Sequence, residues 1–165
     1  MAEVLYQYPM VALQHLETNG ATFEVVDFGT IVSHVAAFDD TTEEYLNGKL
    51  RVHADIDTSG TVTFQAAVVA KTGAASKNVA LTLGHRPVND NEAIDGAYTD
   101  EDSGDKAIAA TQDNQTLATW TETVTNLGWA ANDLVYFRIS RPAAGANNLA
   151  GDMYWLDFSV RLPIT

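Results

Sequence analysis

Short segments of alternating apolar and polar side chains run through most of this sequence, and Gly, Asn, Asp and Ser separate them. Successive side chains of a β-strand point to opposite faces of a sheet, so a period of two is typical of half-buried strands. Because ten such strands are too many for one flat sheet, they favour two packed sheets. The segments expected to form strands are Val4–Tyr8, Ala21–Phe28, Ile31–Phe38, Lys49–Ile56, Thr61–Ala70, Val79–Leu83, Ala107–Gln112, Thr116–Thr125, Leu134–Ser140 and Met153–Leu162.

The chain has 165 residues, which is enough for one hydrophobic core and too few for two domains of ordinary size. We predict a single all-β domain over residues 1–165, an antiparallel two-sheet sandwich of jelly-roll type with about ten strands. A short N-terminal arm (residues 1–10) and an acidic loop (residues 84–106) complete it. Helix is expected only as single turns, at Val11–Leu16 and Asp39–Leu46.

Two neighbouring segments, Lys49–Ile56 and Thr61–Ala70, show the alternation most clearly. Each places apolar side chains at every second position, and the turn residues 57–60 lie between them. The pattern predicts a hairpin in which the two apolar faces point to the core.

The last segment, Met153–Leu162, is expected to pair with Leu134–Ser140. Strict alternation from Tyr154 to Leu162 puts one set of apolar side chains inward and turns the intervening side chains outward. Large outward aromatic and arginine side chains are typical of subunit interfaces. The predicted interface candidates are Tyr136, Arg138, Trp155 and Arg161.

The net charge is −13, from 22 acidic and nine basic residues, and the isoelectric point is near 4.4. This charge repels phosphate backbones and anionic lipid, and the scattered Lys and Arg form no basic patch, so we expect no direct nucleic-acid or membrane contact. The N-terminus lacks the basic start and apolar run of a signal peptide, and no apolar segment is as long as a membrane span. We therefore expect a soluble protein that is made in the cytoplasm.

Two clusters have the composition of metal sites. His53 and Asp55, with His85 further along, match the two-histidine, one-carboxylate triad of iron oxygenases, but His53 and Asp55 share the polar face of their strand. The acidic run Thr99–Asp105 could supply oxygen ligands to calcium, but its spacing does not fit an EF-hand loop. A solvated strand face and a solvated loop account for the two clusters.

The chain has no cysteine, which excludes disulfides, thiolate metal sites and a cysteine nucleophile. Gly-x-Ser-x-Gly and glycine-rich phosphate loops are also absent. Paired catalytic carboxylates are defined by their separation in space, and the sequence leaves them open. We expect no catalytic residue, no cofactor and no metal, and hence a structural or binding protein.

The tryptophans Trp120, Trp129 and Trp155 suggest a second kind of binding site. A flat aromatic ring can bury the apolar face of a sugar, as in carbohydrate-binding sandwiches. Core packing is the simpler explanation for Trp120, and a subunit interface is the preferred one for Trp155.

The segment Asn132–Arg141, followed by Asn148–Asp152 and the last strand, resembles the closing hairpin of structural proteins of tailed bacteriophages. The shared pattern is an acidic turn, an aromatic strand with Arg-x-x-Arg, a Gly-Asp turn and an aromatic last strand. The resemblance implies a jelly-roll virion protein, located in the virion and most simply a capsid cement or decoration protein. It would form a homotrimer and contact the major capsid protein or another virion protein. The alternative is a carbohydrate-binding or host-receptor-recognition module of a phage fibre or tail, which would bind a glycan.

Overall fold

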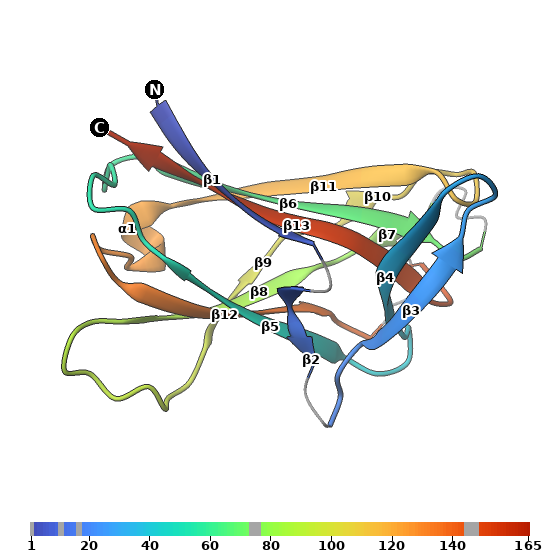
Figure 1. The fold of residues 1–165 in the computed structure, drawn as a ribbon, viewed down its shortest axis with the longest axis horizontal. Helices are drawn as coiled ribbons and strands as arrows, with labels where there is room; N and C mark the ends of the chain where they lie inside the picture. The colour runs from blue at the N-terminus through green and yellow to red at the C-terminus, as the bar shows by residue number, and fades with distance from the viewer. Residues whose placement is uncertain (1, 10–11, 16–17, 73–76, 144–148) are drawn as a thin grey trace.

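In the computed structural model, which describes residues 2–9, 12–15, 18–72, 77–143 and 149–165, two antiparallel sheets pack face to face (Figure 1). The predicted all-β, two-sheet sandwich of jelly-roll type is therefore confirmed. The described residues form a six-stranded sheet, a five-stranded sheet and a two-stranded ribbon.

The first sheet has the strand order β11-β6-β13-β4-β3. Its sixth strand, β1, also pairs with β13. The second sheet has the order β2-β5-β12-β8-β9, and β7 pairs with β10 as the ribbon. One short helix, α1, follows β11. The bounds are β1 Ala2–Pro9, β2 Gln14–His15, β3 Thr22–Asp27, β4 Val32–Phe38, β5 Glu44–Arg51, β6 Thr61–Ala70, β7 Asn78–Val79, β8 Thr82–Val88, β9 Thr99–Asp102, β10 Lys106–Ala107, β11 Gln115–Thr123, α1 Val124–Leu127, β12 Leu134–Arg141 and β13 Met153–Ile164.

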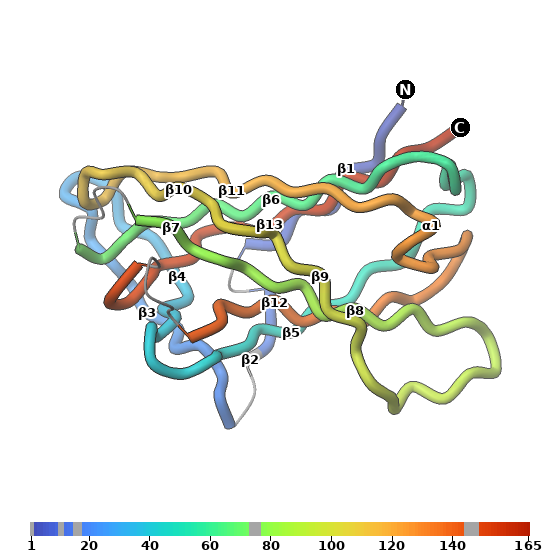
Figure 2. The backbone as a smooth tube through the Cα atoms, turned by 180° about the vertical axis from the view of Figure 1, so that it is seen from behind, coloured from blue at the N-terminus to red at the C-terminus, as the bar shows by residue number. Residues whose placement is uncertain are grey.

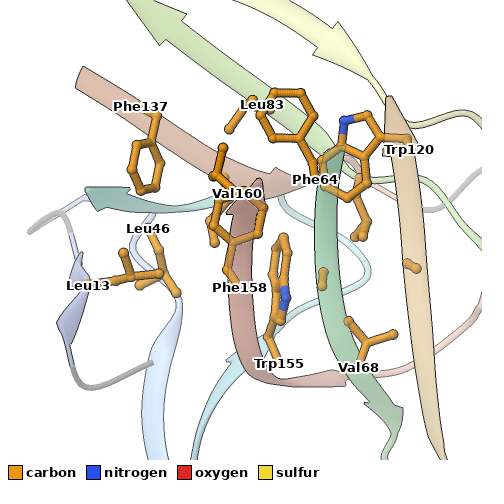
Figure 3. Packing of buried hydrophobic residues seen from close by; sticks show 14 of the residues in the cluster. Leu13, Leu46, Phe64, Val68, Leu83, Trp120, Phe137, Trp155, Phe158 and Val160 are labelled. Carbon is orange, nitrogen blue, oxygen red and sulfur yellow. The ribbon is translucent and has the colours of Figure 1, made fainter. Parts of the chain in front are cut away.

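The core lies between the two sheets and is rich in aromatic rings (Figure 3). Phe64 of β6 stacks on Trp120 of β11 with ring centroids 5.5 Å apart, and Phe137 of β12 meets Phe158 of β13 at 5.7 Å. Each fully buried ring contributes on the order of 2 kcal/mol to folding through the apolar surface that it removes from water. The rings therefore hold the sheets together at their centre.

The predicted hairpin between Lys49–Ile56 and Thr61–Ala70 is wrong. β5 lies in the second sheet, between β2 and β12, whereas β6 lies in the first sheet, between β11 and β13. The residues between β5 and β6 cross from one sheet to the other. The alternation correctly buries Leu50, Val52 and Phe64, but alternation alone does not say which sheet a strand joins.

The predicted pairing of the last two strands is also wrong, because β12 pairs with β5 and β8, while β13 pairs with β1, β4 and β6. A β-bulge in β13 changes the face of its first residues. The pairing to β6 shifts between Trp155 and Asp157, so Leu156 is an extra residue. Trp155 and Phe158 consequently both point into the core, and Trp155 is 0% exposed instead of outward-facing (Figure 3).

The N-terminal segment, expected to be an arm with a strand at Val4–Tyr8, is a regular strand over Ala2–Pro9, so the strand is confirmed and extends over nearly the whole arm. β1 pairs with β13 from Ala2 opposite Ile164 to Pro9 opposite Asp157. Its inward-facing tyrosines reach the second sheet, since the hydroxyl of Tyr8 donates to the carbonyl oxygen of Lys49 at 3.0 Å.

The helical turn predicted at Asp39–Leu46 is wrong, because β5 begins at Glu44. Of the turn predicted at Val11–Leu16, the first and last residues lie outside the described residues, and Gln14–His15 form β2.

Candidate functional site

The face of the second sheet that points away from the core carries an ordered set of polar and aromatic side chains. Opposed residues of neighbouring strands point to the same face, so the strand register gives their arrangement. One row across the sheet is Lys49 of β5, Tyr136 of β12 and Arg86 of β8. The next row is Asn47, Arg138, Gly84 and Asp100 of β9. We call this surface the outer face of the second sheet.

Arg138 is fixed at the centre of this face. Its guanidinium lies over the rings of Tyr45 and Tyr98, 4.9 Å from each centroid, and Nη2 is 3.1 Å from Oδ1 of Asp100. Gly84 provides the necessary space, because a Cβ at this position would lie 2.6 Å from Nε of Arg138 and 2.7 Å from Oδ1 of Asp100. A cation between two aromatic rings and beside a carboxylate is held in one place, and it in turn orients both tyrosines.

A loop of residues 89–98 borders one side of the face, and Figure 2 shows it projecting from the second sheet between β8 and β9. Arg86 holds the loop by donating to the carbonyl oxygens of Ala93 and Ile94 at 2.9 and 3.2 Å. The guanidinium packs against Gly96, where a Cβ would lie 2.4 Å from it. The acidic region 84–106 is therefore not one irregular loop, because it contains the end of β8 and the whole of β9.

Two grooves lie on this face, and Tyr136 lines both of them. The N-terminal groove has a volume of about 500 Å³ and the loop groove one of about 560 Å³. The described residues of the N-terminal groove are Gln7, Tyr8, Ala12, Gln14, Asn47, Gly48, Lys49, Tyr98 and Tyr136. Those of the loop groove are Arg51, Val88, Asn89, Asp90, Asn91, Glu92, Ile94, Ala131, Asn132, Leu134 and Tyr136. Together the grooves give a long surface with a tyrosine near its middle.

The chemistry of this surface suits binding of a polar, ring-containing ligand. Tyrosine rings offer flat apolar faces, and amide and charged side chains offer hydrogen bonds around them. Burial raises the pKa of Tyr8 to about 12, with the charge of Tyr6 adding to the shift. Burial and a hydrogen bond with Glu43 likewise raise the pKa of Tyr45. The phenol groups of Tyr8 and Tyr45 therefore stay protonated at neutral pH.

The four predicted interface residues do not form one strip. Tyr136 and Arg138 lie on the outer face of the second sheet. Trp155 is in the core, and Arg161 of β13 lies on the outside of the first sheet, 3.8 Å from Glu3. An interface role for the exposed members stays a prediction.

The histidine and tryptophan candidates have other surroundings. His53 is 3.9 Å from Asp55 at the surface, whereas His85 is buried and its Nδ1 accepts a hydrogen bond from Nε1 of Trp129 at 3.2 Å. Within the described residues, no group of three or more His, Asp or Glu could hold a metal ion. Trp120, Trp129 and Trp155 are all in the core, so none of them is open to a sugar.

Sequence reasoning missed Tyr45 and Tyr98. Tyr45, Asn47 and Lys49 alternate with Leu46 and Leu50, so extending the strand to Glu44 would have placed Tyr45 on the same face as Lys49. Tyr98 lies in a loop, where the pattern of the sequence gives no signal for its position.

No family model and no curated protein matches this chain. Among solved structures it is similar to the CBM35 carbohydrate-binding module from Cellvibrio japonicus Abf62, with a TM-score of 0.57 and 13% identity over 95% of this chain and 92% of that one. A protein from Bacteroides thetaiotaomicron VPI-5482 described as sugar-binding has a TM-score of 0.52 and 11% identity over 95% and 87% of the two chains. The CBM22-1–GH10 modules of Clostridium thermocellum endo-1,4-beta-D-xylanase 10B, complexed with xylohexaose, have a TM-score of 0.50 and 9% identity over 93% of this chain and 26% of theirs.

At these identities the comparisons show the fold alone. A structure of infectious bursal disease virus is also similar, with a TM-score of 0.45 and 10% identity over 99% of this chain and 34% of that one. A likeness at that level carries no argument about function.

Among the described residues, no helix is long and apolar enough to cross a membrane.

Proposed function

We propose that this protein is a non-catalytic carbohydrate-binding module that holds a glycan chain along the outer face of the second sheet. The observation that carries the proposal is the pair of grooves that share Tyr136. A fold similar to those of carbohydrate-binding modules supports it. The fold similarity gives less support to the capsid-decoration function that the phage resemblance implies than to its alternative, a glycan-binding module.

The position of Tyr136 suggests how a glycan would bind. A sugar ring stacked on this tyrosine would have Lys49 and Arg86 on either side, because these residues oppose Tyr136 in the neighbouring strands. Rings bound before and after it would occupy the two grooves. Tyr98, held by Arg138, offers a second aromatic face in the N-terminal groove. Since the central side chains are already ordered, little entropy is lost on binding.

Calorimetric titration with a panel of soluble oligosaccharides tests the proposal. The expected result is binding of at least one glycan of four or more sugars, with about tenfold loss of affinity in Tyr136→Ala, because one stacked ring contributes on the order of 1–2 kcal/mol. Leu117→Ala is the matched control, since Leu117 is an exposed residue on the first sheet. Absence of binding across the panel, or equal affinity of the Tyr136→Ala variant, would contradict the proposal.

A second candidate function, capsid decoration, rests on a different surface. The β3–β4 hairpin at the edge of the first sheet exposes Val25 and Val32 to 62% and 64%, and neighbouring Ile31 to 66%. Exposed apolar side chains at a sheet edge are typical of protein contacts. Electron microscopy of particles assembled with wild-type protein and with Val25→Ser/Val32→Ser tests this function. Retention of the double variant on the shell at wild-type occupancy would contradict it.

A further inference from the structure

The positive charges of this acidic protein are concentrated on the proposed binding face. Four of its nine Lys and Arg residues lie there: Lys49, Arg51, Arg86 and Arg138. The chain as a whole has 22 acidic residues, so cations grouped on one face contrast with the rest of the surface.

Three of these four cations already have partners. Arg138 pairs with Asp100, Arg86 donates to the loop carbonyls, and Nη1 of Arg51 donates to the carbonyl oxygen of Asn132 at 2.7 Å. The exposed ammonium of Lys49 has no hydrogen bond or ion pair to any of the described residues. Lys49 is therefore the cation of this face that can pair with a ligand.

The two grooves also differ in charge. Lys49 is the only charged residue among the described residues that line the N-terminal groove, and Asn47 and Gln14 beside it are neutral amides. The loop groove, in contrast, includes two carboxylates, Asp90 and Glu92, against one cation, Arg51, which already donates to the carbonyl oxygen of Asn132. A negatively charged ligand group would be attracted at one end of the site and repelled at the other.

From this asymmetry we propose that the N-terminal groove binds a sugar that carries a carboxylate, a uronic acid, and that Lys49 pairs with it. The inference rests on the proposed glycan-binding function and adds the class and position of the sugar. The carboxylate would accept a charge-assisted hydrogen bond from the ammonium of Lys49, while Asn47 and Gln14 would bind hydroxyl groups. The sugars in the loop groove would be neutral, because Asp90 and Glu92 disfavour a second carboxylate there.

The test compares acidic oligosaccharides with the same molecules after reduction of the carboxyl group to an alcohol. The probes are xylo-oligosaccharides with one glucuronic acid and oligogalacturonides, titrated calorimetrically into the full chain. An exposed ion pair in a groove corresponds to about three- to tenfold in affinity. We expect the singly acidic probe to bind that much more tightly than its reduced form, and the Lys49→Gln variant to bind the acidic and reduced probes with equal affinity.

Lys77→Gln is the matched control, because Lys77 is an exposed lysine that lines neither groove, and its loss changes the net charge by the same amount. Equal affinity of wild-type protein for acidic and reduced probes, or a preference that survives in Lys49→Gln, would overturn the uronic-acid inference alone. Binding of only neutral glycans would do the same. Absence of binding to every probe and to the neutral panel would instead overturn the glycan-binding function itself.

Discussion

The guanidinium of Arg141 in β12 donates a hydrogen bond to the carbonyl oxygen of Phe38 in β4, 3.2 Å away, and so joins the two sheets at a buried point. The same guanidinium donates to the carbonyl oxygens of Gly151 and Leu149. Burial lowers the pKa of Arg141, and nearby carboxylates, that of Asp40 first, oppose this effect. The side chain is 1% exposed, so its charge depends on these partners for stabilisation.

Replacing this arginine should therefore be among the most destabilising changes in the molecule. Arg141→Met removes the hydrogen bonds to three carbonyl groups and the positive charge beside Asp40, and the expected loss is about 3–5 kcal/mol in the free energy of unfolding. Urea denaturation followed by tryptophan fluorescence measures it. Arg161→Met is the control, because Arg161 is exposed and its loss should cost less than about 1 kcal/mol. Equal losses in the free energy of unfolding of the two variants would show that the buried hydrogen bonds of Arg141 do not stabilise the fold.

Gly84→Ala should impair ligand binding more than folding. The added methyl group would overlap the side chains of Arg138 and Asp100, and Arg138 would have to leave its place between Tyr45 and Tyr98. We expect about tenfold weaker glycan binding and a loss of about 1 kcal/mol in stability. Calorimetry and urea denaturation of the same preparation separate the two effects. An unchanged affinity would mean that the order of Arg138 has no role in binding.

Alkaline pH should weaken the contact between β1 and β5. The unfolded pKa of tyrosine is about 10 and burial raises that of Tyr8 to about 12, so the folded protein holds this proton more tightly. The contribution of protonated Tyr8 to the free energy of unfolding is fully present below pH about 10 and is lost as the pH rises towards 12. Because the ring is only half-buried, we expect a loss of about 1–2 kcal/mol.

Urea denaturation at pH 9 and pH 11.5 measures this loss. The Tyr8→Phe variant serves as the comparison, since it should be about 1 kcal/mol less stable at pH 9 for want of its hydrogen bond to Lys49. It should then change less than the wild type between the two pH values. A parallel decline of both proteins would assign the effect to other groups.

Mild acid should act on the protein through His85. Burial lowers the pKa of this histidine, and the charge of Asp100 opposes the shift, so the unfolded chain binds the proton more readily than the folded one. The free energy of unfolding should therefore fall as the pH drops below about 6.5. His85→Gln keeps an acceptor for Nε1 of Trp129 and removes the titration. Denaturation curves at pH 7 and pH 5 should show a smaller decline in this variant, and an identical decline would exclude His85 as the cause.

Local patterns in the sequence predicted the strands better than their pairing. The bounds of β6 match the predicted Thr61–Ala70, because polar and apolar residues alternate from Thr61 to Ala66 and a continuous apolar run follows to Ala70. β9, with the sequence Thr-Asp-Glu-Asp, falls within the predicted acidic loop, since it has no apolar residue to mark a buried face. Its place in the sheet depends on pairing with β8, which is a long-range property.

The site could be predicted only in part for similar reasons. Tyr136 and Arg138 were correctly expected on an outward face, because β12 alternates without interruption. The prediction for Trp155 is wrong because Leu156 is an extra residue in the bulge. The bulge exchanges the inward and outward faces for the residues of β13 that precede it. The contact of Arg138 with Tyr45 and Tyr98 brings together three segments that are far apart in the sequence. The spacing of residues within one segment does not predict such a contact.

The tyrosines of β1 also cover part of an edge of the second sheet. Among the described residues, β2 pairs with β5 only at Asn47 and Leu46, and no described strand pairs with Lys49 or Arg51 on that side, so their carbonyl groups lie at an open strand edge. The hydroxyls of Tyr8 and Tyr6 donate to these two oxygens. An open edge is a template on which a foreign strand can add and begin aggregation. By occupying its acceptors with side chains, the protein closes this edge to an incoming strand without adding another strand of its own.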